Sequence, residues 1–254
     1  MSLADEYAAQ SAWRAWPAAI ATLPPLEGRR VLDLGCGPGA QAALLCARGA
    51  RVIGFDAHAG LIEEARARRI AGAEFHLADL RALPDSAQDA DGIWCSFAAA
   101  YLTDLRPVLE AWSRRLRPGG WMALAEVDDL FAHEPLGERT RELLEAYADE
   151  ALAAGRYDFR MGRRLARELR EAGLEVALES SLSDGEFSFQ GPATPAVLGA
   201  WDRRLERMLG LQRFCGAGFA DLRRDFLAAL AHGEHRSASR VCWCVAGTGL
   251  SGAS

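Results

Sequence analysis

Short apolar runs alternate with longer amphipathic stretches through the first half of the chain. The runs predict strands, whereas the stretches between them carry apolar residues at helical spacing and predict helices. The predicted strands cover 30–34, 51–55, 73–77, 92–96 and 121–126, and the predicted helices cover 40–48, 60–70 and 105–116. Alternation on this scale indicates an α/β fold with a parallel, doubly wound sheet.

The alternation breaks down in the second half. The predicted elements there are a helical insert at 136–154, a helix at 161–172, a strand at 174–180 and a last strand at 241–246. The long segment between these two strands holds a short predicted strand at 187–189 and amphipathic helices around 201–211 and 219–231. Amphipathic helices need an apolar surface to cover. We therefore expect residues 182–239 to form an inserted helical lid.

An amphipathic stretch also precedes the first strand. Apolar residues recur at helical spacing over 4–23 and stop at Pro24-Pro25, which predicts a helix ahead of the main domain. Asp5 and Glu6 stand where a secretory signal would carry basic residues, and no apolar run is long enough to span a bilayer. We expect a cytoplasmic protein with no membrane partner.

Composition narrows the function classes. Of the 254 residues, 50% are hydrophobic, which suits one α/β domain with inserted segments. The formal net charge is −6 and the arginine clusters lie among acids, so no nucleic-acid partner is expected. The six cysteines show no CxxC spacing, which predicts neither disulfides nor a zinc site. The absence of lysine excludes a Schiff-base enzyme and a P-loop of the GxxxxGK(S/T) kind.

A glycine-rich turn links the first predicted strand to the first helix. Gly35, Gly37 and Gly39 alternate there, so a ligand can approach the backbone without meeting a Cβ. Such a turn suits a nucleotide-like cofactor. Gly35, Gly37 and Ala40 also satisfy the dinucleotide fingerprint G-x-G-x-x-A, which leaves NAD open.

Two carboxylates follow the next strands. Asp56 ends the second strand, where it can accept hydrogen bonds from a ribose diol of NAD or of S-adenosylmethionine equally well. Asp79 follows the third strand, where an acid can accept from an exocyclic adenine amine. Both residues therefore favour an adenosine-containing cofactor.

With these residues in place, 26–128 resembles the class I S-adenosylmethionine-dependent methyltransferases, particularly small-molecule enzymes of the ubiquinone and menaquinone type. Further marks are the stretch 91–96 and the Arg-Pro-Gly-Gly turn at 117–120, which a dehydrogenase does not require. The resemblance implies a Rossmann-like sheet of seven strands with a late antiparallel strand. It also implies S-adenosylmethionine as the cofactor and no metal.

The resemblance assigns roles to residues at the ends of the first four strands. The expected cofactor-binding residues are Asp33, Gly35, Cys36, Gly37, Gly39, Asp56, Ala57, Ala78, Asp79, Leu80 and Ser96. By this resemblance Asp33 would hold the methionine ammonium, directly or through water, and the Ser96 backbone would lie near the methionine end. The glycine turn would line the methionine and ribose portions. Asp56 would take the ribose hydroxyls, and Asp79 and Leu80 would meet the adenine.

The acceptor side departs from the family. Many relatives carry His-His where this chain reads Ala100-Tyr101, so Tyr101 either orients the acceptor by hydrogen bonding or simply packs. Glu126 and Asp128 lie near the carboxyl end of the fifth strand and either serve the acceptor, as ligand or base, or are solvated loop acids. Tyr101 and Glu126 are the candidate catalytic residues. His133 and five aromatic residues are further candidates for the acceptor cavity, the aromatic ones with core packing as the alternative: Trp13, Trp16, Trp201, Phe214 and Phe219.

The sequence thus predicts methyl transfer from S-adenosylmethionine to an oxygen, nitrogen or carbon of a small-molecule acceptor. The alternatives are an NAD-dependent oxidoreductase and a non-catalytic S-adenosylmethionine-binding module. We expect a cofactor domain over 26–181 and 240–247, a helix over 1–25 that is part of the lid, and the lid itself over 182–239. A monomer or a homodimer is expected.

Overall fold

A seven-stranded sheet runs through the molecule in the order β3-β2-β1-β4-β5-β9-β7 in a computed structural model that describes residue 7 and residues 10–248. The strands are β1 (Arg30–Leu34), β2 (Arg51–Asp56), β3 (Ala73–Leu77), β4 (Ala90–Ser96), β5 (Leu116–Asp128), β7 (Glu175–Leu182) and β9 (Arg240–Gly247). Strands β1 to β5 pair in parallel, and β9 lies antiparallel between β5 and β7. The predicted doubly wound sheet with a late antiparallel strand is confirmed.

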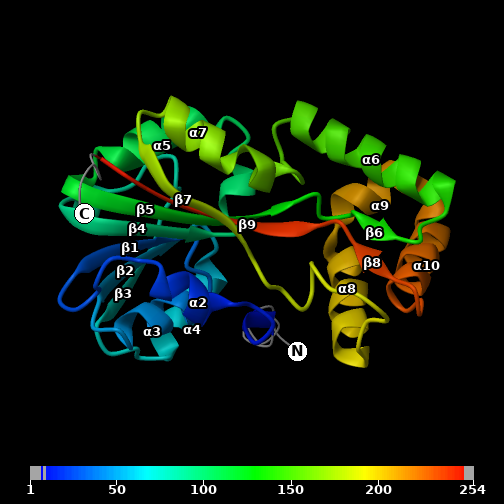
Figure 1. Ribbon diagram of the computed structural model, residues 1–254, viewed down its shortest axis with the longest axis horizontal. Helices are drawn as coiled ribbons and strands as arrows, with labels where there is room; N and C mark the ends of the chain where they lie inside the picture. The colour runs from blue at the N-terminus through cyan, green and yellow to red at the C-terminus, as the bar shows by residue number, and fades with distance from the viewer. Residues whose placement is uncertain (1–6, 8–9, 249–254) are drawn as a thin grey trace.

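Helices cover both faces of this sheet (Figure 1). One face carries α5 (Leu105–Ser113) and α7 (Leu165–Glu171), and the other carries α2 (Trp16–Ala21), α3 (Ala40–Cys46) and α4 (Ala59–Ala67). Since both faces are covered, the central strands are buried almost along their whole length, as in β1 and β4.

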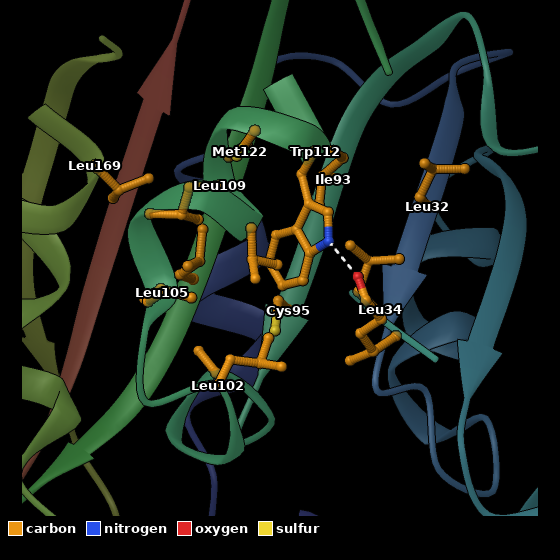
Figure 2. Packing of buried hydrophobic residues seen from close by; sticks show 14 of the residues in the cluster. Leu32, Leu34, Ile93, Cys95, Leu102, Leu105, Leu109, Trp112, Met122 and Leu169 are labelled. Atoms are coloured by element: carbon orange, nitrogen blue, oxygen red, sulfur yellow. Dashed lines mark hydrogen bonds between the residues drawn. The ribbon is translucent and has the colours of Figure 1, made fainter. Parts of the chain in front are cut away.

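Helix α5 shows how the pattern of apolar residues fixes this packing. Leu105, Val108, Leu109 and Trp112 recur at helical spacing, and all four are buried. Figure 2 shows Trp112 packed on the sheet with its indole directed at the chain after β3. Its Nε1 donates to the carbonyl oxygen of Leu80 at 2.8 Å, so the loop that carries Asp79 is tied to the core.

A second group of helices lies beside the sheet (Figure 1). It contains α6 (Glu138–Ala153), α8 (Pro195–Arg207), α9 (Leu209–Cys215), α10 (Phe219–Leu230) and a small sheet of β6 (His133–Glu134) and β8 (Arg236–Ser237). These helices share an apolar core of their own, in which Leu144 of α6 and Trp201 of α8 are buried together with Phe226 of α10. The insert after β5 and the segment after β7 therefore build one helical layer.

Four short 3-10 turns complete the fold: η1 (Asp85–Ala87), η2 (Ala99–Tyr101), η3 (Met161–Arg164) and η4 (Gly216–Gly218). Turn η2 follows β4 and carries Tyr101. The Arg-Pro-Gly-Gly segment at 117–120 lies within β5 as a bulge, because Ala90 of β4 pairs with Leu116 and the next pair between the two strands joins Gly92 to Trp121.

Three predicted elements differ from the structure. A single helix over 4–23 is wrong, because the chain turns at 12–13 and Arg14 forms a β-bridge with Asp184 before α2 begins; residues 1–6 and 8–9 lie outside the described part. A strand over 187–189 is wrong, since only isolated bridges occur near it. The helix expected at 201–211 begins at Pro195, where the Thr194 hydroxyl caps the amide of Val197, and it ends at Arg207.

Candidate active site

A cavity of about 610 Å³ opens at the carboxyl ends of the parallel strands. One group of lining residues, which we name the cofactor end for the role expected from the sequence, follows β1 to β4: Gly35, Cys36, Gly37, Asp56, Ala57, Asp79, Leu80 and Ser96. The other end, the acceptor end, is lined from the N-terminal segment, turn η2 and the helical layer: Arg14, Trp16, Phe97, Tyr101, Leu130, Tyr157, Phe187 and Arg204. The sheet and the helical layer therefore share one cavity.

The turn after β1 is shaped so that only glycine fits at two of its positions. Gly35 has φ +78°, and a Cβ there would lie 2.4 Å from the Cβ of Ala98. Gly39 has φ +84°, and a Cβ there would lie 2.9 Å from the Phe75 ring. Gly37 lines the cavity between them. The turn thus brings bare backbone to the cofactor end, as the glycine spacing predicts.

Asp56 connects this turn to the loop after β2. Its Oδ2 accepts a hydrogen bond from the amide of Gly37 at 2.9 Å, and its Oδ1 accepts one from the amide of His58 at 2.8 Å. Each carboxylate oxygen has a further lone pair for a ligand hydroxyl. His58 also lines the cavity, and its Nδ1 accepts from the amide of Leu61 to cap α4.

Asp79 stands at the rim of the cofactor end. Its side chain is largely exposed, and its Oδ1 accepts from the amide of Arg81 at 2.9 Å. Arg81 in turn donates through Nη2 to the carbonyl oxygen of Tyr101 at 3.0 Å. The loops after β3 and β4 are thereby joined at the rim.

Asp33, Gly39, Ala78 and Glu126 were expected at the site but do not line the cavity. Asp33 lies beneath the glycine turn, and its Oδ2 is buried without a hydrogen-bond partner among the described residues. Burial, assisted by the charge of Asp56, raises the pKa of the Asp33 carboxyl to about 7. Gly39 caps α3 behind the turn, and the amide of Ala78 donates to the carbonyl oxygen of Asp56.

Glu126 is sequestered under turn η2. Its Oε1 accepts from the amide of Ala100 at 3.0 Å and its Oε2 from the amide of Val127 at 3.3 Å. Burial raises the pKa of the Glu126 carboxyl to about 8, although these amides act in the opposite direction. The structure therefore places Glu126 as a support for the turn that carries Tyr101, not in contact with the cavity.

Tyr101 projects into the acceptor end and meets Tyr157, which comes from the loop between α6 and η3. The two ring centroids are 4.7 Å apart with the rings edge to face. Desolvation raises the pKa of the Tyr101 phenol to about 12 and that of Tyr157 well above its usual value. Both phenols are neutral near pH 7 and can donate hydrogen bonds. Nothing in the spacing of the sequence marks Tyr157 as a site residue.

A buried ionic cluster closes the acceptor end. Arg14 pairs with Asp184 at 2.6 Å and with Glu186, and Glu186 pairs with Arg204 at 2.7 Å. Both guanidinium groups lie over the Phe187 ring, that of Arg14 at 4.3 Å and that of Arg204 at 4.9 Å from the ring centroid. The sequence pattern does not mark these residues for the site, beyond placing Asp184, Glu186 and Arg204 in the 182–239 segment.

The other candidates fall mostly outside the cavity. Of the five aromatic residues, Trp16 alone lines it; Trp13 and Phe219 pack against the core of the helical layer, Trp201 is buried in that core, and Phe214 is partly exposed. His133 is buried against His235, with Nδ1 3.0 Å from the partner Nε2. Burial and this second ring lower the pKa of His133 to about 3.

Asp128 is not a solvated acid. Its carboxylate is buried and pairs with Arg163 and with Arg240, the latter at 2.8 Å. Within residue 7 and residues 10–248, no group of three or more His, Cys, Asp or Glu is placed to hold a metal ion. In that same part of the chain, none of the helices combines the length and apolar character needed to cross a bilayer.

Comparison with known proteins finds a match in the segment over which the family resemblance was drawn, residues 26–128. Residues 31–120 match the methyltransferase domain family. The malonyl-(acyl-carrier protein) O-methyltransferase of Enterobacter lignolyticus (strain SCF1) is 31% identical over 186 residues, which are 72% of this chain and 64% of that protein. These matches support a class I S-adenosylmethionine-dependent methyltransferase. The resemblance drawn from the glycine turn, Asp56 and Asp79 is thereby confirmed.

Other relatives and solved structures agree on the family and the fold. The demethylmenaquinone methyltransferase of Clavibacter sepedonicus is 36% identical over 117 residues, 45% of this chain and 46% of that protein. The chain therefore spans between about half and two thirds of the length of these relatives. Among solved structures, the (4+2)-cyclase SpnF superposes with a TM-score of 0.60 at 19% identity, covering 91% of this chain and 78% of that one. That likeness shows the shared Rossmann-like fold.

Proposed function

We propose that this methyltransferase carries the methyl group of S-adenosylmethionine to an oxygen, nitrogen or carbon of a small-molecule acceptor. The observation that carries the proposal is one continuous cavity. Its cofactor end has the glycine turn, Asp56 and Asp79, and its acceptor end has Tyr101 and Arg204. NAD-dependent oxidation, the alternative left open by the glycine fingerprint, gains no support from the family match or from β9.

The residues at the cofactor end fit S-adenosylmethionine. A Cβ at Gly35 would clash with Ala98, so the turn presents bare backbone there, and each oxygen of Asp56 keeps a lone pair that could accept from a ribose hydroxyl. Asp79 would accept from the adenine amine at the rim, next to Leu80. Asp33 is buried with an unpartnered oxygen, and a cationic ammonium nearby would stabilise its ionised form.

The cofactor, when bound, supplies a methyl group already activated by its sulfonium. What the chain must add is alignment of donor and acceptor in a site that excludes water, which supplies several kcal/mol. Tyr101 and Tyr157 would orient the acceptor from one side, and Glu126 would hold turn η2 in place through the amide of Ala100. No obligatory catalytic dyad is required for this chemistry.

We also propose that the N-terminal segment and residues 182–239 act as a lid over the acceptor. Two observations support a lid made of these two segments. Arg14 joins the two segments through Asp184 and Glu186, and both segments contribute to the cavity wall. Because α6 shares its apolar core with α8 and α10, the lid would move against the sheet together with α6 or hinge on it.

The compartment, the oligomeric state and the partners of the enzyme are also part of the proposal. We place the enzyme in the cytoplasm as a monomer or homodimer that acts on a small molecule and uses no nucleic-acid or membrane partner. A formal net charge of −6 and six free cysteines support this assignment.

The test is incubation with methyl-labelled S-adenosylmethionine and fractionated cell extract. We expect one fraction to yield a labelled small molecule together with S-adenosylhomocysteine. A protein that binds the cofactor but labels nothing in any fraction would support the non-catalytic binding module instead.

A further inference from the structure

The acceptor end of the cavity offers hydrogen-bond donors and no evident base. Among the described residues that line the cavity, the carboxylates Asp56 and Asp79 and the imidazole of His58 all belong to the cofactor end. The polar side chains at the other end are the two arginines, the tyrosines, and the neutral Gln10 and Ser11 beside them. An acceptor that must lose a proton before attack finds no carboxylate or imidazole there.

The guanidinium group of Arg204 has an N–H donor that no acceptor in the described part of the protein uses. Its Nη2 donates to Oε1 of Glu186 at 2.7 Å, while its Nε is buried and has no hydrogen-bond partner. The guanidinium lies over the rings of Phe187 and Trp201, which hold it in place at the cavity wall. A buried guanidinium N–H without an acceptor is unfavourable, so the pairing of Arg204 within the protein is incomplete. Because Arg204 lines the cavity, a bound anion would complete it.

The ionic cluster leaves Arg204 the less neutralised of the two cations. Arg14 donates from Nη1 to both oxygens of Asp184 and from Nη2 to Glu186. Glu186 thus divides its two oxygens between Arg14 and Arg204, and Asp184 serves Arg14. An anionic group at Arg204 would be paired by the remaining guanidinium N–H groups.

The phenols extend the same donor set. Tyr101 and Tyr157 lie edge to face at 4.7 Å, and both line the cavity with Arg204. Being neutral near pH 7, each phenol can donate its O–H to an oxyanion. Apart from Gln10, Ser11 and Arg14, the surrounding wall is apolar, with Trp16, Leu130 and Phe187 among its residues.

We propose that the acceptor is a carboxylic acid with an apolar body, bound as its carboxylate by Arg204, Tyr101 and Tyr157 and methylated on a carboxylate oxygen. This inference rests on the proposed function and names its substrate class. An oxygen lone pair forms the new C–O bond, the C–S bond breaks with its electron pair passing to sulfur, and a methyl ester and S-adenosylhomocysteine result. Since the nucleophile is already ionised, the step releases no proton.

The experiment compares acids with their uncharged isosteres on the full chain. Octanoate and hydrocinnamate are titrated into the protein with S-adenosylhomocysteine bound, beside octanamide, octanol and the amide and alcohol of hydrocinnamate. We expect at least one acid to bind on the order of tenfold more tightly than its amide, as a charge-assisted hydrogen bond would give. With S-adenosylmethionine, that acid should yield its methyl ester with no proton released in a pH-stat.

Variants assign the preference to residues. Arg204→Gln should reduce the preference for acid over amide to a few-fold, and Tyr157→Phe, which keeps the ring, should weaken acid binding while leaving amide binding nearly unchanged. Arg204→Gln also removes an ion-pair partner of the buried Glu186 and can destabilise the fold. The comparison of acid with amide in the wild type and the Tyr157→Phe variant test the proposal independently of Arg204→Gln. If no acid in the set binds more tightly than its amide, or if the alcohol or amide is methylated instead, the acceptor class is wrong.

Binding of S-adenosylmethionine, measured first in the same samples, separates the two claims. A protein that binds this cofactor and prefers uncharged acceptors overturns the acceptor class alone. A protein that does not bind it overturns the proposed function and the acceptor class with it.

Discussion

At the scale of single residues, the site depends on two buried carboxyls that do not touch the cavity. Asp33 lies under the glycine turn and Glu126 under turn η2, and burial raises the pKa of both. Each is next to the backbone that shapes one end of the cavity. The protonation state of these two carboxyls therefore affects the stability of the site, and neither carboxyl transfers a proton to or from a ligand.

Glu126 gives the stability a recognisable pH dependence. Its folded pKa of about 8 exceeds the usual 4.5, so the folded state binds an extra proton between these values. Its contribution to stability is complete below pH 4.5 and is lost as the pH rises through 8, at up to about 1.4 kcal/mol per pH unit. Denaturant unfolding should therefore show Glu126→Gln losing less stability than the wild type between pH 5 and 8. Parallel curves for the two proteins would contradict this account.

Tyr101 should matter for orientation and not as a base. A pKa of about 12 keeps its phenol protonated at working pH, so Tyr101→Phe removes a hydrogen bond and leaves the ring on Tyr157. We expect the methyl-transfer rate to fall by roughly tenfold or less, well short of the 10²–10⁴-fold that general-base catalysis contributes. Cofactor affinity is the control and should not change. Complete loss of turnover with both ligands bound would make Tyr101 the catalytic base.

The sequence predicts some site residues and not others for a physical reason. Gly35, Asp56 and Asp79 follow strands directly, and the carboxyl ends of parallel strands meet at one edge of a sheet. Tyr157 and Arg204 reach the cavity through the packing of the helical layer, which has no fixed spacing from any strand. Glu126 was placed at the correct strand end, but only the structure shows that turn η2 covers it.

At the scale of elements, the contact between the N-terminal segment and the 182–239 segment decides how the cavity is closed. Arg14 holds Asp184 and Glu186, and the exposed fractions of these three side chains are 5%, 1% and 0%. A pair this deeply buried differs from the many surface ion pairs of the helices, whose removal has little effect.

Arg14→Ala should therefore be strongly destabilising. It leaves two buried carboxylates short of a partner, and breaking a buried pair costs about 3–5 kcal/mol. Arg224→Ala is the matched control, because Arg224 and its partner Asp221 are 69% and 70% exposed and such a pair contributes about 0.2–1 kcal/mol. Chemical denaturation of both variants measures the difference. Equal stabilities would mean that the cluster around Glu186 does not secure the N-terminal segment.

The lid makes a separate prediction about these elements. If the N-terminal segment and residues 182–239 close over the acceptor, amide hydrogen exchange in both should slow when cofactor and acceptor are bound together. Strands β1 and β4 serve as the internal reference, since they are buried on both faces in any state. Exchange in the two segments that responds to neither ligand would speak against a lid.

At the scale of the whole molecule, alternation of strands and helices was enough to predict the parallel part of the sheet. The late antiparallel strand followed from the family resemblance and is confirmed; the structure adds that this strand, β9, lies between β5 and β7. The sequence did not show that the insert after β5 and the segment after β7 share one apolar core, because amphipathic helices reveal a buried face but not its partner. That shared core is what brings Tyr157 and Arg204 to the same cavity.

The central claim is that this cavity holds S-adenosylmethionine, and calorimetric titration with S-adenosylmethionine, S-adenosylhomocysteine and NAD tests it most directly. We predict micromolar binding of the first two and none of NAD. Asp56→Ala should weaken binding by roughly 1.5–3 kcal/mol through lost hydrogen bonds to a charged group, whereas Glu63→Ala, on the exposed side of α4, should leave affinity unchanged. Binding of NAD without S-adenosylmethionine would contradict the account, and an unchanged affinity in Asp56→Ala would remove Asp56 from the site.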